Sequence, residues 1–229
     1  MNDIYAIIVA AGTGTRFGSD IPKQFLPLGK DRKPVLMHTI LAFQEAGIKT
    51  ENIRVTLHAE MTGFWEELCR EHGFLSPPVV VGGETRFHSV QNTLKTIDCE
   101  PFATIMIHDG VRPLIPKEVI ERVLETICDN ETVIPAVPVT DSIRLINSDG
   151  ESHSVDRSKY VSVQTPQAFK AGILFKAYNE PYSPIYTDDA SVVEKVGARI
   201  TLTMGSYDNI KITTPKDLLI AEEILKEKQ

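Results

Sequence analysis

The strongest constraint on the fold lies near the start of the chain, where a continuous apolar run is followed at once by a glycine-rich turn. Residues 4–9 are apolar at every position, which is typical of a strand buried on both faces of a parallel sheet. The turn at 10–18 contains Gly12, Gly14 and Gly18, and glycine lets backbone N–H groups approach phosphate oxygens closely. Such a turn leaves the carboxyl edge of the sheet, where open α/β sheets bind ligands. The sequence therefore predicts an α/β protein with an anion-binding turn after its first strand.

The turn matches neither of the common phosphate-binding patterns. The dinucleotide fingerprint G-x-G-x-x-G fails because Phe17 replaces its last glycine, and no Gly-Lys-Ser/Thr follows to make a P-loop. A turn that merely needs glycine is therefore an open alternative. Arg16 and Lys23 favour phosphate binding, because nucleotidyl transfer needs positive charge around the reacting phosphorus. The net charge of −7 argues against a general nucleic-acid surface. In such an acidic chain, two positive charges beside the turn point to a local anion-binding site.

The rest of the chain alternates strand patterns with helix patterns. Strand-like runs occur at 53–57, 79–81, 104–107 and 132–137. Helical spacing of apolar residues occurs at 35–43, 64–69, 87–94 and 119–127. This alternation predicts a mostly parallel, Rossmann-like sheet covered by helices on both faces. We expect two further helices at 171–178 and 190–196, followed by a strand at 199–204. The chain is then expected to end in a helix with Thr214 as its cap and Pro215 at its first position.

The alternation breaks between 141 and 160, where a β-hairpin is expected. Two short strand-like runs flank residues 147–150, and the Asp149-Gly150 pair favours the geometry of a hairpin turn. A hairpin inserted into an α/β sheet has no helix of its own to cover it. We therefore expect one domain over 1–229 with a β-arm at about 141–160, packed on its own domain or on a second subunit. The second arrangement predicts a homodimer.

Composition indicates a cytoplasmic protein without a membrane partner. No apolar run in the 229 residues approaches the roughly 20 residues that span a bilayer. The first residues enter the strand without a basic segment, which argues against a signal peptide. Cys69, Cys99 and Cys128 show no metal-binding or redox spacing and are typical of idle thiols in a reducing compartment.

Eight motifs carry a resemblance to a known family. The turn, Ala10-Ala11-Gly12-x-Gly14-x-Arg16, and the following Pro22-Lys23-Gln24-Phe25 are similar to the signature of the sugar- and polyol-phosphate nucleotidyltransferases. The further motifs are GGETRFHSV at 82–90, HDGVRP at 108–113, DSI at 141–143, DR at 156–157, QTPQ at 164–167, TDDA at 187–190 and DNIK at 208–211. In this order they resemble the 2-C-methyl-D-erythritol 4-phosphate cytidylyltransferase family over nearly the whole chain.

The resemblance implies transfer of CMP from CTP to a polyol phosphate, with pyrophosphate as the leaving group. It implies that Arg16, Lys23 and Lys211 are the catalytic cations around the triphosphate, although Lys211 taken alone is more typical of a solvated lysine. The positions that it implies for binding CTP are Ala10, Ala11, Gly12, Gly14, Gly83, Glu84, Ser89, Asp109 and Gly110. The positions that it implies for the polyol phosphate, partly across a dimer interface, are Arg112, Ser142, Arg157, Thr165 and Thr187.

Asp109 ends an apolar strand, where a lone carboxylate is costly unless it is paired or bound to metal. The expected cofactor is Mg²⁺, which arrives with the triphosphate, and Asp109 is its expected ligand. Arg112 could instead orient Asp109, and Arg86 is as consistent with a salt bridge as with ligand binding. His108 is expected to be structural, because an attacking phosphate is already anionic and needs no general base.

Two other functions remain open from the sequence. Ribitol-5-phosphate cytidylyltransferase would share nearly every motif and differ in the polyol that it binds. A catalytically idle nucleotide-binding module would keep the fold, but it has no need for Arg16, Lys23, Asp109 and Lys211 together.

Overall fold

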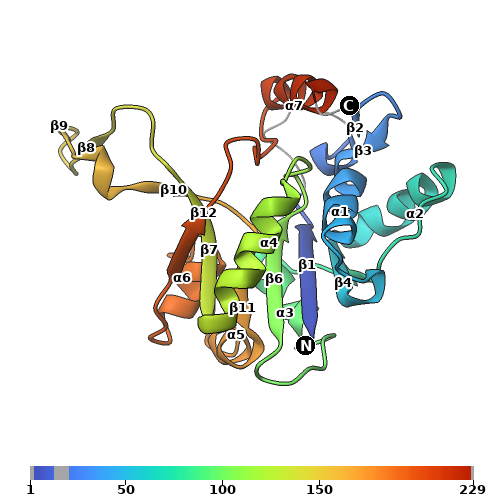
Figure 1. The fold of residues 1–229 in the computed structure, drawn as a ribbon, viewed down its shortest axis with the longest axis horizontal. Helices are drawn as coiled ribbons and strands as arrows, with labels where there is room; N and C mark the ends of the chain where they lie inside the picture. Colours follow the sequence, from blue (N-terminus) through green and yellow to red (C-terminus); the bar gives the residue numbers. More distant parts are fainter. Residues whose placement is uncertain (1–2, 13–20, 228–229) are drawn as a thin grey trace.

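A computed structural model describes residues 3–12 and 21–227 of the chain. The core of the protein is a β-sheet that contains a run of parallel strands. The first strand of the chain, β1 (Ile4–Ala10), lies inside this run, with a neighbour on each side (Figure 1). β1 pairs in parallel with β6 (Thr104–Asp109) on one side and with β4 (Ile53–Leu57) on the other. β5 (Val79–Val81) continues the parallel run beyond β4. These four strands stand where the sequence predicted them.

The other half of the sheet is mixed. Its strands are β7 (Thr132–Pro138), β10 (Val161–Val163), β11 (Gln167–Lys170) and β12 (Thr201–Met204). β11 lies antiparallel between β6 and β7, β10 is antiparallel to β7, and β12 is parallel to β7. The sequence analysis did not anticipate β10 and β11, which bring the chain from the arm back into the sheet. The strand order is β10-β7-β11-β6-β1-β4-β5, with β12 also on β7.

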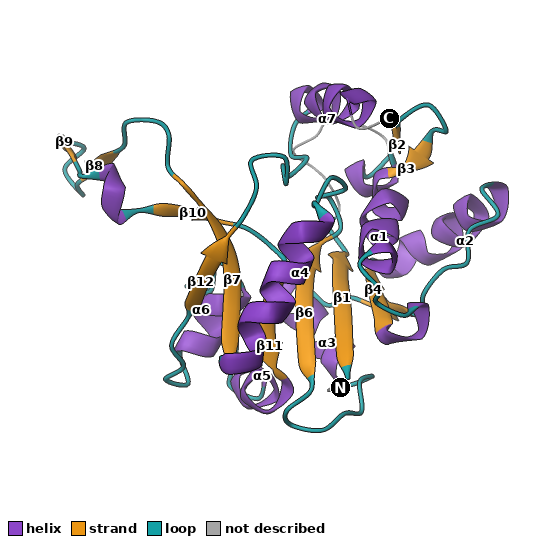
Figure 2. Cartoon of the chain, in the orientation of Figure 1, coloured by secondary structure: helices purple, strands orange, loops and turns teal. Residues whose placement is uncertain are grey.

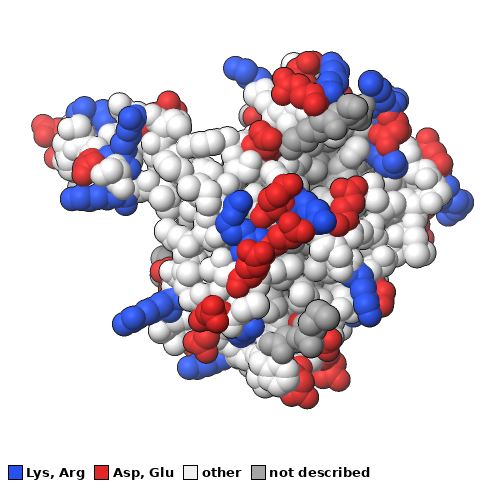
Figure 3. Space-filling model, viewed as in Figure 1, with Lys and Arg blue, Asp and Glu red and all other residues white. Residues whose placement is uncertain are grey.

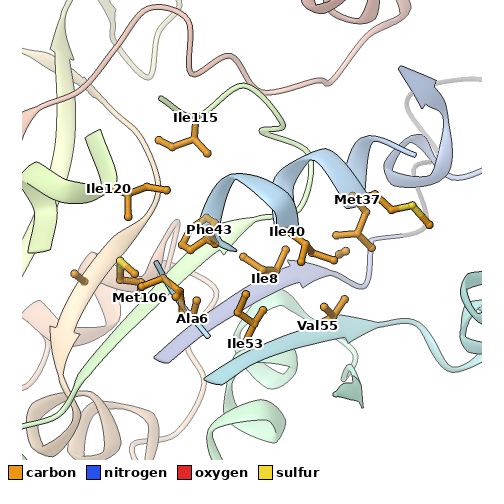
Figure 4. Close-up of a cluster of buried hydrophobic side chains, with 14 of the residues drawn as sticks. Ala6, Ile8, Met37, Ile40, Phe43, Ile53, Val55, Met106, Ile115 and Ile120 are labelled. Atoms are coloured by element: carbon orange, nitrogen blue, oxygen red, sulfur yellow. The ribbon is translucent and has the colours of Figure 1, made fainter. Parts of the chain in front are cut away.

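Helices cover both faces of the sheet, as predicted. Successive side chains of β1 point to opposite faces, so the strand contributes to a hydrophobic core on each side. Ile8 belongs to a core shared with α1 (Val35–Glu45), α2 (Thr62–Glu71) and α4 (Lys117–Thr126). Its neighbour Ile7 belongs to a second core, which includes residues of α3 (Arg86–Leu94), α5 (Ala171–Tyr178) and α6 (Asp189–Glu194). Figure 2 shows the helices around the sheet, and Figure 4 shows Ile40 and Phe43 of α1 beside Ile8.

The predicted hairpin is present and projects from the sheet as an arm (Figure 1). β8 (Arg144–Ile146) and β9 (Ser152–Ser154) pair antiparallel, and Gly150 in the turn between them has a φ of +87°. Every residue of both strands is exposed in the single chain. The arm therefore has no cover within its own chain.

The C-terminal helix covers a small separate layer. α7 (Pro215–Glu227) contacts the hairpin of β2 (Pro27–Leu28) and β3 (Lys33–Pro34). Its predicted cap is confirmed, because Thr214 Oγ1 accepts a hydrogen bond from Asp217 N and Asp217 Oδ2 accepts one from Thr214 N. Short 3-10 helices are η1 (Lys23–Phe25), η2 (Thr50–Asn52), η3 (Ala59–Met61), η4 (Ile127–Asp129) and η5 (Arg157–Lys159).

The surface carries charges of both signs. On the face shown in Figure 3, acidic and basic side chains are interspersed. Within residues 3–12 and 21–227, no helix is long and apolar enough to cross a membrane.

Candidate active site

A large cleft opens at the carboxyl edge of the parallel strands. Its volume is about 1010 Å³, and it gathers residues that the sequence analysis assigned to CTP and catalysis. The assigned residues that line it are Ala10, Ala11, Gly12, Lys23, Gly83, Glu84, Ser89, Asp109 and Lys211. Two further assigned residues, Gly14 and Arg16, lie outside the described part of the chain.

Strand register explains why residues far apart in sequence meet here. Val9 of β1 is paired with Asp109 of β6, so the glycine-rich turn and the carboxylate leave the sheet side by side. Ala10 is paired with Leu57 of β4, whose carbonyl accepts a hydrogen bond of 2.8 Å from Gly82 N. The loop after β5 is thereby drawn across the end of β4 toward the turn.

A buried glutamine holds the start of the turn in place. Gln24 Nε2 donates to the carbonyl oxygens of Ala10 and Gly12, each at 2.9 Å. Gln24 is buried and follows Lys23 in the short helix η1. These hydrogen bonds therefore fix the backbone at Ala10 and Gly12, and the neighbouring Lys23 lies at the cleft wall.

Asp109 is the centre of a cluster of charges. Its Oδ2 lies 3.0 Å from Lys211 Nζ and 3.2 Å from Arg112 Nε, and its Oδ1 lies 3.7 Å from Arg86 Nε. Burial raises the pKa of this carboxyl, but the three cations outweigh burial and hold the pKa well below its usual range. Asp109 is therefore ionised at neutral pH.

Arg86 is held rigidly from behind. Its guanidinium makes two parallel hydrogen bonds of 2.7 and 2.6 Å to the carboxylate of Asp189, which is fully buried. Tyr178 donates its hydroxyl to the same carboxylate at 2.6 Å. Burial opposes the charge on Arg86, but Asp189 raises the pKa of the guanidinium above its ordinary value. The salt-bridge alternative for Arg86 is thus confirmed.

His108 is structural in this geometry. It is fully buried, its Nδ1 lies 3.0 Å from Thr165 Oγ1, and its Nε2 lies 3.3 Å from the carbonyl oxygen of Arg112. Burial lowers the pKa of His108 from 6.5 to about 4, with Asp109 opposing the shift and Arg112 adding to it. The imidazole is therefore neutral at physiological pH.

The neutral His108 predicts a loss of stability on mild acidification. The unfolded chain binds a proton near pH 6.5 and the folded chain only near pH 4, so protons favour unfolding between these values. We expect His108 to lower the free energy of unfolding by about 2 kcal/mol from pH 7.5 to pH 5. Urea unfolding of wild type and His108→Gln at both pH values measures this contribution. An identical pH dependence in the two proteins would contradict it.

The loop after β5 is shaped by two glycines. A Cβ on Gly83 would lie 2.5 Å from His88 Cβ, and one on Gly82 would lie 2.6 Å from Ala11 Cβ, so neither position has room for a side chain. Ser89 Oγ accepts a hydrogen bond from Gly83 N at 3.1 Å and donates one to the Thr85 carbonyl at 2.9 Å. Ser89 thus supports the loop as well as lining the cleft.

Three residues assigned to ligands stand behind the cleft and do not line it. Arg112 spans Asp109 and the carbonyl oxygen of Asn209, which accepts from Arg112 Nη1 at 2.7 Å. Thr165 is buried, and its Oγ1 accepts a hydrogen bond of 3.1 Å from Asp109 N. Gly110 is also buried, with its carbonyl bonded by Thr39 Oγ1. All three hold the end of β6, and direct ligand contact by any of them stays a prediction.

The remaining substrate assignments lie elsewhere in the single chain. Ser142 and Arg157 belong to the exposed arm, where Arg157 Nη1 donates to the carbonyl oxygen of Thr140. Thr187 lines a separate cavity of about 130 Å³ beside Arg86 and Tyr178. The structure therefore gathers the nucleotide residues in one chain but does not bring the arm residues to the cleft of that chain.

Among the cleft residues that were not assigned from the sequence, Gln24 and His58 are the most informative. Gln24 had been quoted only as part of a motif, and its glutamine amide next to Lys23 was the available signal. His58 lines the cleft directly after β4, and its place at the carboxyl end of a predicted strand could have identified it. Its Nδ1 accepts a hydrogen bond from Glu60 N at 3.4 Å.

Asp109 fits a magnesium ion that is held mainly by the triphosphate and not by a cluster of protein carboxylates. Within the described residues, no group of three or more His, Cys, Asp or Glu side chains could hold a metal ion. Oδ2 of Asp109 is engaged by two cations, whereas Oδ1 has Arg86 at 3.7 Å, beyond hydrogen-bonding distance. Mg²⁺ is commonly held by one or two carboxylates together with substrate phosphates. The site fits an ion that arrives with a triphosphate.

The fold and the cleft define the chain as an α/β nucleotidyltransferase, with the start of the glycine-rich turn, two lysines and the Asp109 carboxylate at the carboxyl edge of a parallel sheet. The family model "IspD: 2-C-methyl-D-erythritol 4-phosphate cytidylyltransferase" matches residues 4–227, and the chain belongs to this family. These enzymes transfer CMP from CTP to 2-C-methyl-D-erythritol 4-phosphate in non-mevalonate isoprenoid biosynthesis, and this is the activity of the chain.

Relatives and solved structures agree with this assignment. The chain is 47% identical to 2-C-methyl-D-erythritol 4-phosphate cytidylyltransferase of Bacteroides fragilis over 221 residues, 96% of this chain and 98% of the relative. The Francisella tularensis enzyme of the same name has a crystal structure with a TM-score of 0.80 and 31% identity, covering 96% and 99% of the two chains. A structure from Anaerococcus prevotii, 4-diphosphocytidyl-2C-methyl-D-erythritol synthase, gives 0.80 at 26% identity, with 98% and 99% covered. These names favour neither ribitol phosphate transfer nor an idle binding module.

Proposed function

We propose that the cleft binds CTP as its magnesium complex and that the phosphate of the polyol attacks the α-phosphorus directly. The observation that carries this proposal is the convergence of Lys23, Asp109 and Lys211 on one cleft with the backbone of the glycine-rich turn. Lysines act as point charges for phosphate oxygens, and exposed backbone N–H groups add oriented dipoles. In an acidic chain, this is a local concentration of groups suited to a triphosphate.

Catalysis consists of alignment and charge neutralisation. The attacking phosphate is anionic at neutral pH, so none of the side chains has to remove a proton from it. Negative charge builds up on the oxygens of the α-phosphorus in the transition state, where Lys211, Lys23 and Arg16 are assigned. Asp109 Oδ2 holds the Lys211 ammonium at 3.0 Å and limits the positions that it can take. When bound, Mg²⁺ would neutralise triphosphate charge, and Asp109 would hold it on the protein side.

The cytosine ring is assigned to the loop after β5. Gly83 and Glu84 can offer backbone donors and acceptors to the carbonyl and amino groups of cytosine. The absence of a side chain lets Gly82 lie close to Ala11 and Gly83 lie close to His88. We propose that the space beside this loop accepts a pyrimidine in preference to a purine. Ser89 holds the loop through Gly83 N and remains a candidate contact for the base.

A homodimer would complete the polyol site. The arm exposes Leu145 and Ile146, whose exposed fractions of 53% and 71% are high for large apolar side chains. A second copy of the chain is the occupant that covers them and receives Ser142 and Arg157 next to its cleft. Arg157 is suited to clamp the polyol phosphate, and Arg112, Thr165 and Thr187 are assigned to the same substrate.

The location proposed for the enzyme is the cytoplasm. All three cysteines are free, and burial raises the pKa of the Cys69 thiol to about 11, which keeps it protonated. Free thiols of this kind are typical of a reducing compartment.

Mixed dimers test the shared site. Lys211→Ala removes a residue of the cleft, and Arg157→Ala removes a residue of the arm, so each homodimer has two impaired sites. After unfolding and joint refolding in equal amounts, half of the dimers are mixed, and each has one intact site if the arm acts on the partner. We expect pyrophosphate release to recover to about one quarter of wild type. If pyrophosphate release does not recover although subunit exchange is verified, the arm acts on the cleft of its own chain.

A further inference from the structure

Asn209 has no assigned role, although it lies inside a motif of the catalytic segment. It follows β12 and precedes Lys211 by two residues, and it is fully buried. Its side-chain Nδ2 donates to the Thr165 carbonyl at 2.8 Å and to Gln164 Oε1 at 3.3 Å. Both partners are acceptors, so the orientation of the amide is fixed. Asn209 therefore ties the segment that bears Lys211 to the chain between β10 and β11.

This orientation leaves an acceptor unused. Asn209 Oδ1 is the one buried side-chain polar atom without a hydrogen-bond partner in the described part of the chain. Buried polar atoms are nearly always paired, so an unpaired oxygen makes asparagine an unfavourable residue for filling space alone. The two donated hydrogen bonds are the interactions for which asparagine is required.

The backbone of Asn209 makes a second link to the charged centre. Its carbonyl accepts a hydrogen bond of 2.7 Å from Arg112 Nη1, while Arg112 Nε lies 3.2 Å from Asp109 Oδ2. Lys211 reaches the same carboxylate oxygen at 3.0 Å. One residue thus fixes both the segment of Lys211 and the arginine that holds Asp109.

The segment that bears Asn209 and Lys211 is also tied to the chain that returns from the arm. Gln164 Nε2 donates to the Ser206 carbonyl at 2.8 Å, and Gln164 Oε1 accepts from Ser206 N at 3.2 Å. Gln164 directly follows β10, the strand by which the chain returns from the arm. Any displacement at this point of the chain would act on Asn209 and, through it, on Lys211.

We propose that Asn209 is a positioning residue for cytidylyl transfer, which couples the base of the arm to the placement of Lys211 against Asp109. The inference rests on the proposed role of Lys211 at the α-phosphorus. Asn209 itself contacts no substrate. Its effect reaches the reaction through Lys211, both along the chain and through Arg112 and Asp109, which hold the lysine. A displacement of about 1 Å in a catalytic group can lower the rate by up to 10²-fold, so loss of this coupling should appear mainly in kcat.

The test compares Asn209→Asp with a matched control, Asn52→Asp. Asn52 Nδ2 donates to the Ile4 carbonyl at 3.0 Å, a similar side-chain-to-backbone bond at the start of β4, the opposite end from the cleft. We expect Asn209→Asp to lower kcat about 10-fold with the KM for CTP within about twofold, and Asn52→Asp to leave kcat within about twofold. Asn209→Ser, which removes the donors without burying a charge, should reproduce the effect if the aspartate variant does not fold.

A double-mutant cycle separates positioning from general destabilisation. In a Lys211→Ala background, the Asn209 substitution should lower kcat less than about twofold, because the group that it positions is already gone. An equal loss in both backgrounds, or a loss no larger than that of Asn52→Asp, would overturn the inference. Absence of pyrophosphate release by the wild type from CTP and 2-C-methyl-D-erythritol 4-phosphate would instead refute the proposed mechanism itself.

Discussion

Replacing Lys211 by alanine is expected to lower kcat by about 100-fold while leaving the fold intact, since one transition-state contact is typically worth 10²–10³-fold. The side chain is 43% exposed, and its pair with Asp109 is the only ion pair that it makes with the described residues. A partly exposed pair contributes about 0–1 kcal/mol to stability. Steady-state pyrophosphate release with saturating CTP and polyol phosphate, together with thermal unfolding, measures both effects.

Lys49→Ala is the matched control for this experiment. Lys49 is exposed and precedes η2, at the start of β4 and away from the cleft. Its removal should change kcat less than twofold. A Lys211→Ala enzyme that works within a few-fold of wild type would show that the ammonium does not act at the reacting phosphorus.

Asp109→Asn is expected to affect both activity and stability. The substitution keeps the shape of the side chain but removes the negative charge shared by Arg86, Arg112 and Lys211. Leaving Arg112, whose side chain is only 12% exposed, without its counter-charge should lower the free energy of unfolding by about 3 kcal/mol. We expect kcat to fall by at least about 100-fold, because Lys211 loses its anchor and the site loses the carboxylate that we propose as the metal ligand.

Acid stability gives an independent measure of the same carboxylate. A carboxyl with a lowered pKa stabilises the fold above its ordinary value of 3.8, and this stabilisation is lost as the pH falls toward the folded pKa. Wild type should therefore lose stability below about pH 4, and the loss should be smaller in Asp109→Asn. Parallel acid-unfolding curves for the two proteins would mean that Asp109 is not stabilised by its cations.

Much of the fold was predictable because it rests on local patterns. The apolar run at β1 and the helical spacing at α1 are read from neighbouring residues, and both elements stand where expected. β11 was not predictable in this way. Gln167–Lys170 is short, and it becomes a strand because β6 and β7 offer backbone partners on both sides. Such pairing depends on the assembled sheet and leaves little trace in four residues.

The site was predictable in its parts but not in its connections. The glycine-rich turn and Asp109 were identified from their chemistry at strand ends, and Lys23 was identified from its positive charge close to the turn. The bond between Arg86 and Asp189 joins residues 103 positions apart, and no spacing in the sequence announces it. Thr165 shows a different kind of connection: its motif assigned it to the polyol, and its Oγ1 accepts a hydrogen bond from Asp109 N inside the protein, which the motif did not indicate.

The stereochemistry at the α-phosphorus tests the central claim most directly. CTP that carries sulfur in one defined position on the α-phosphate is converted with 2-C-methyl-D-erythritol 4-phosphate, and the configuration of the product is determined by phosphorus NMR. A single direct attack, aligned by Lys211, Lys23 and Arg16, inverts the configuration. Inversion is the result that this mechanism predicts. Retention would require two successive displacements through a covalent enzyme intermediate and would contradict it.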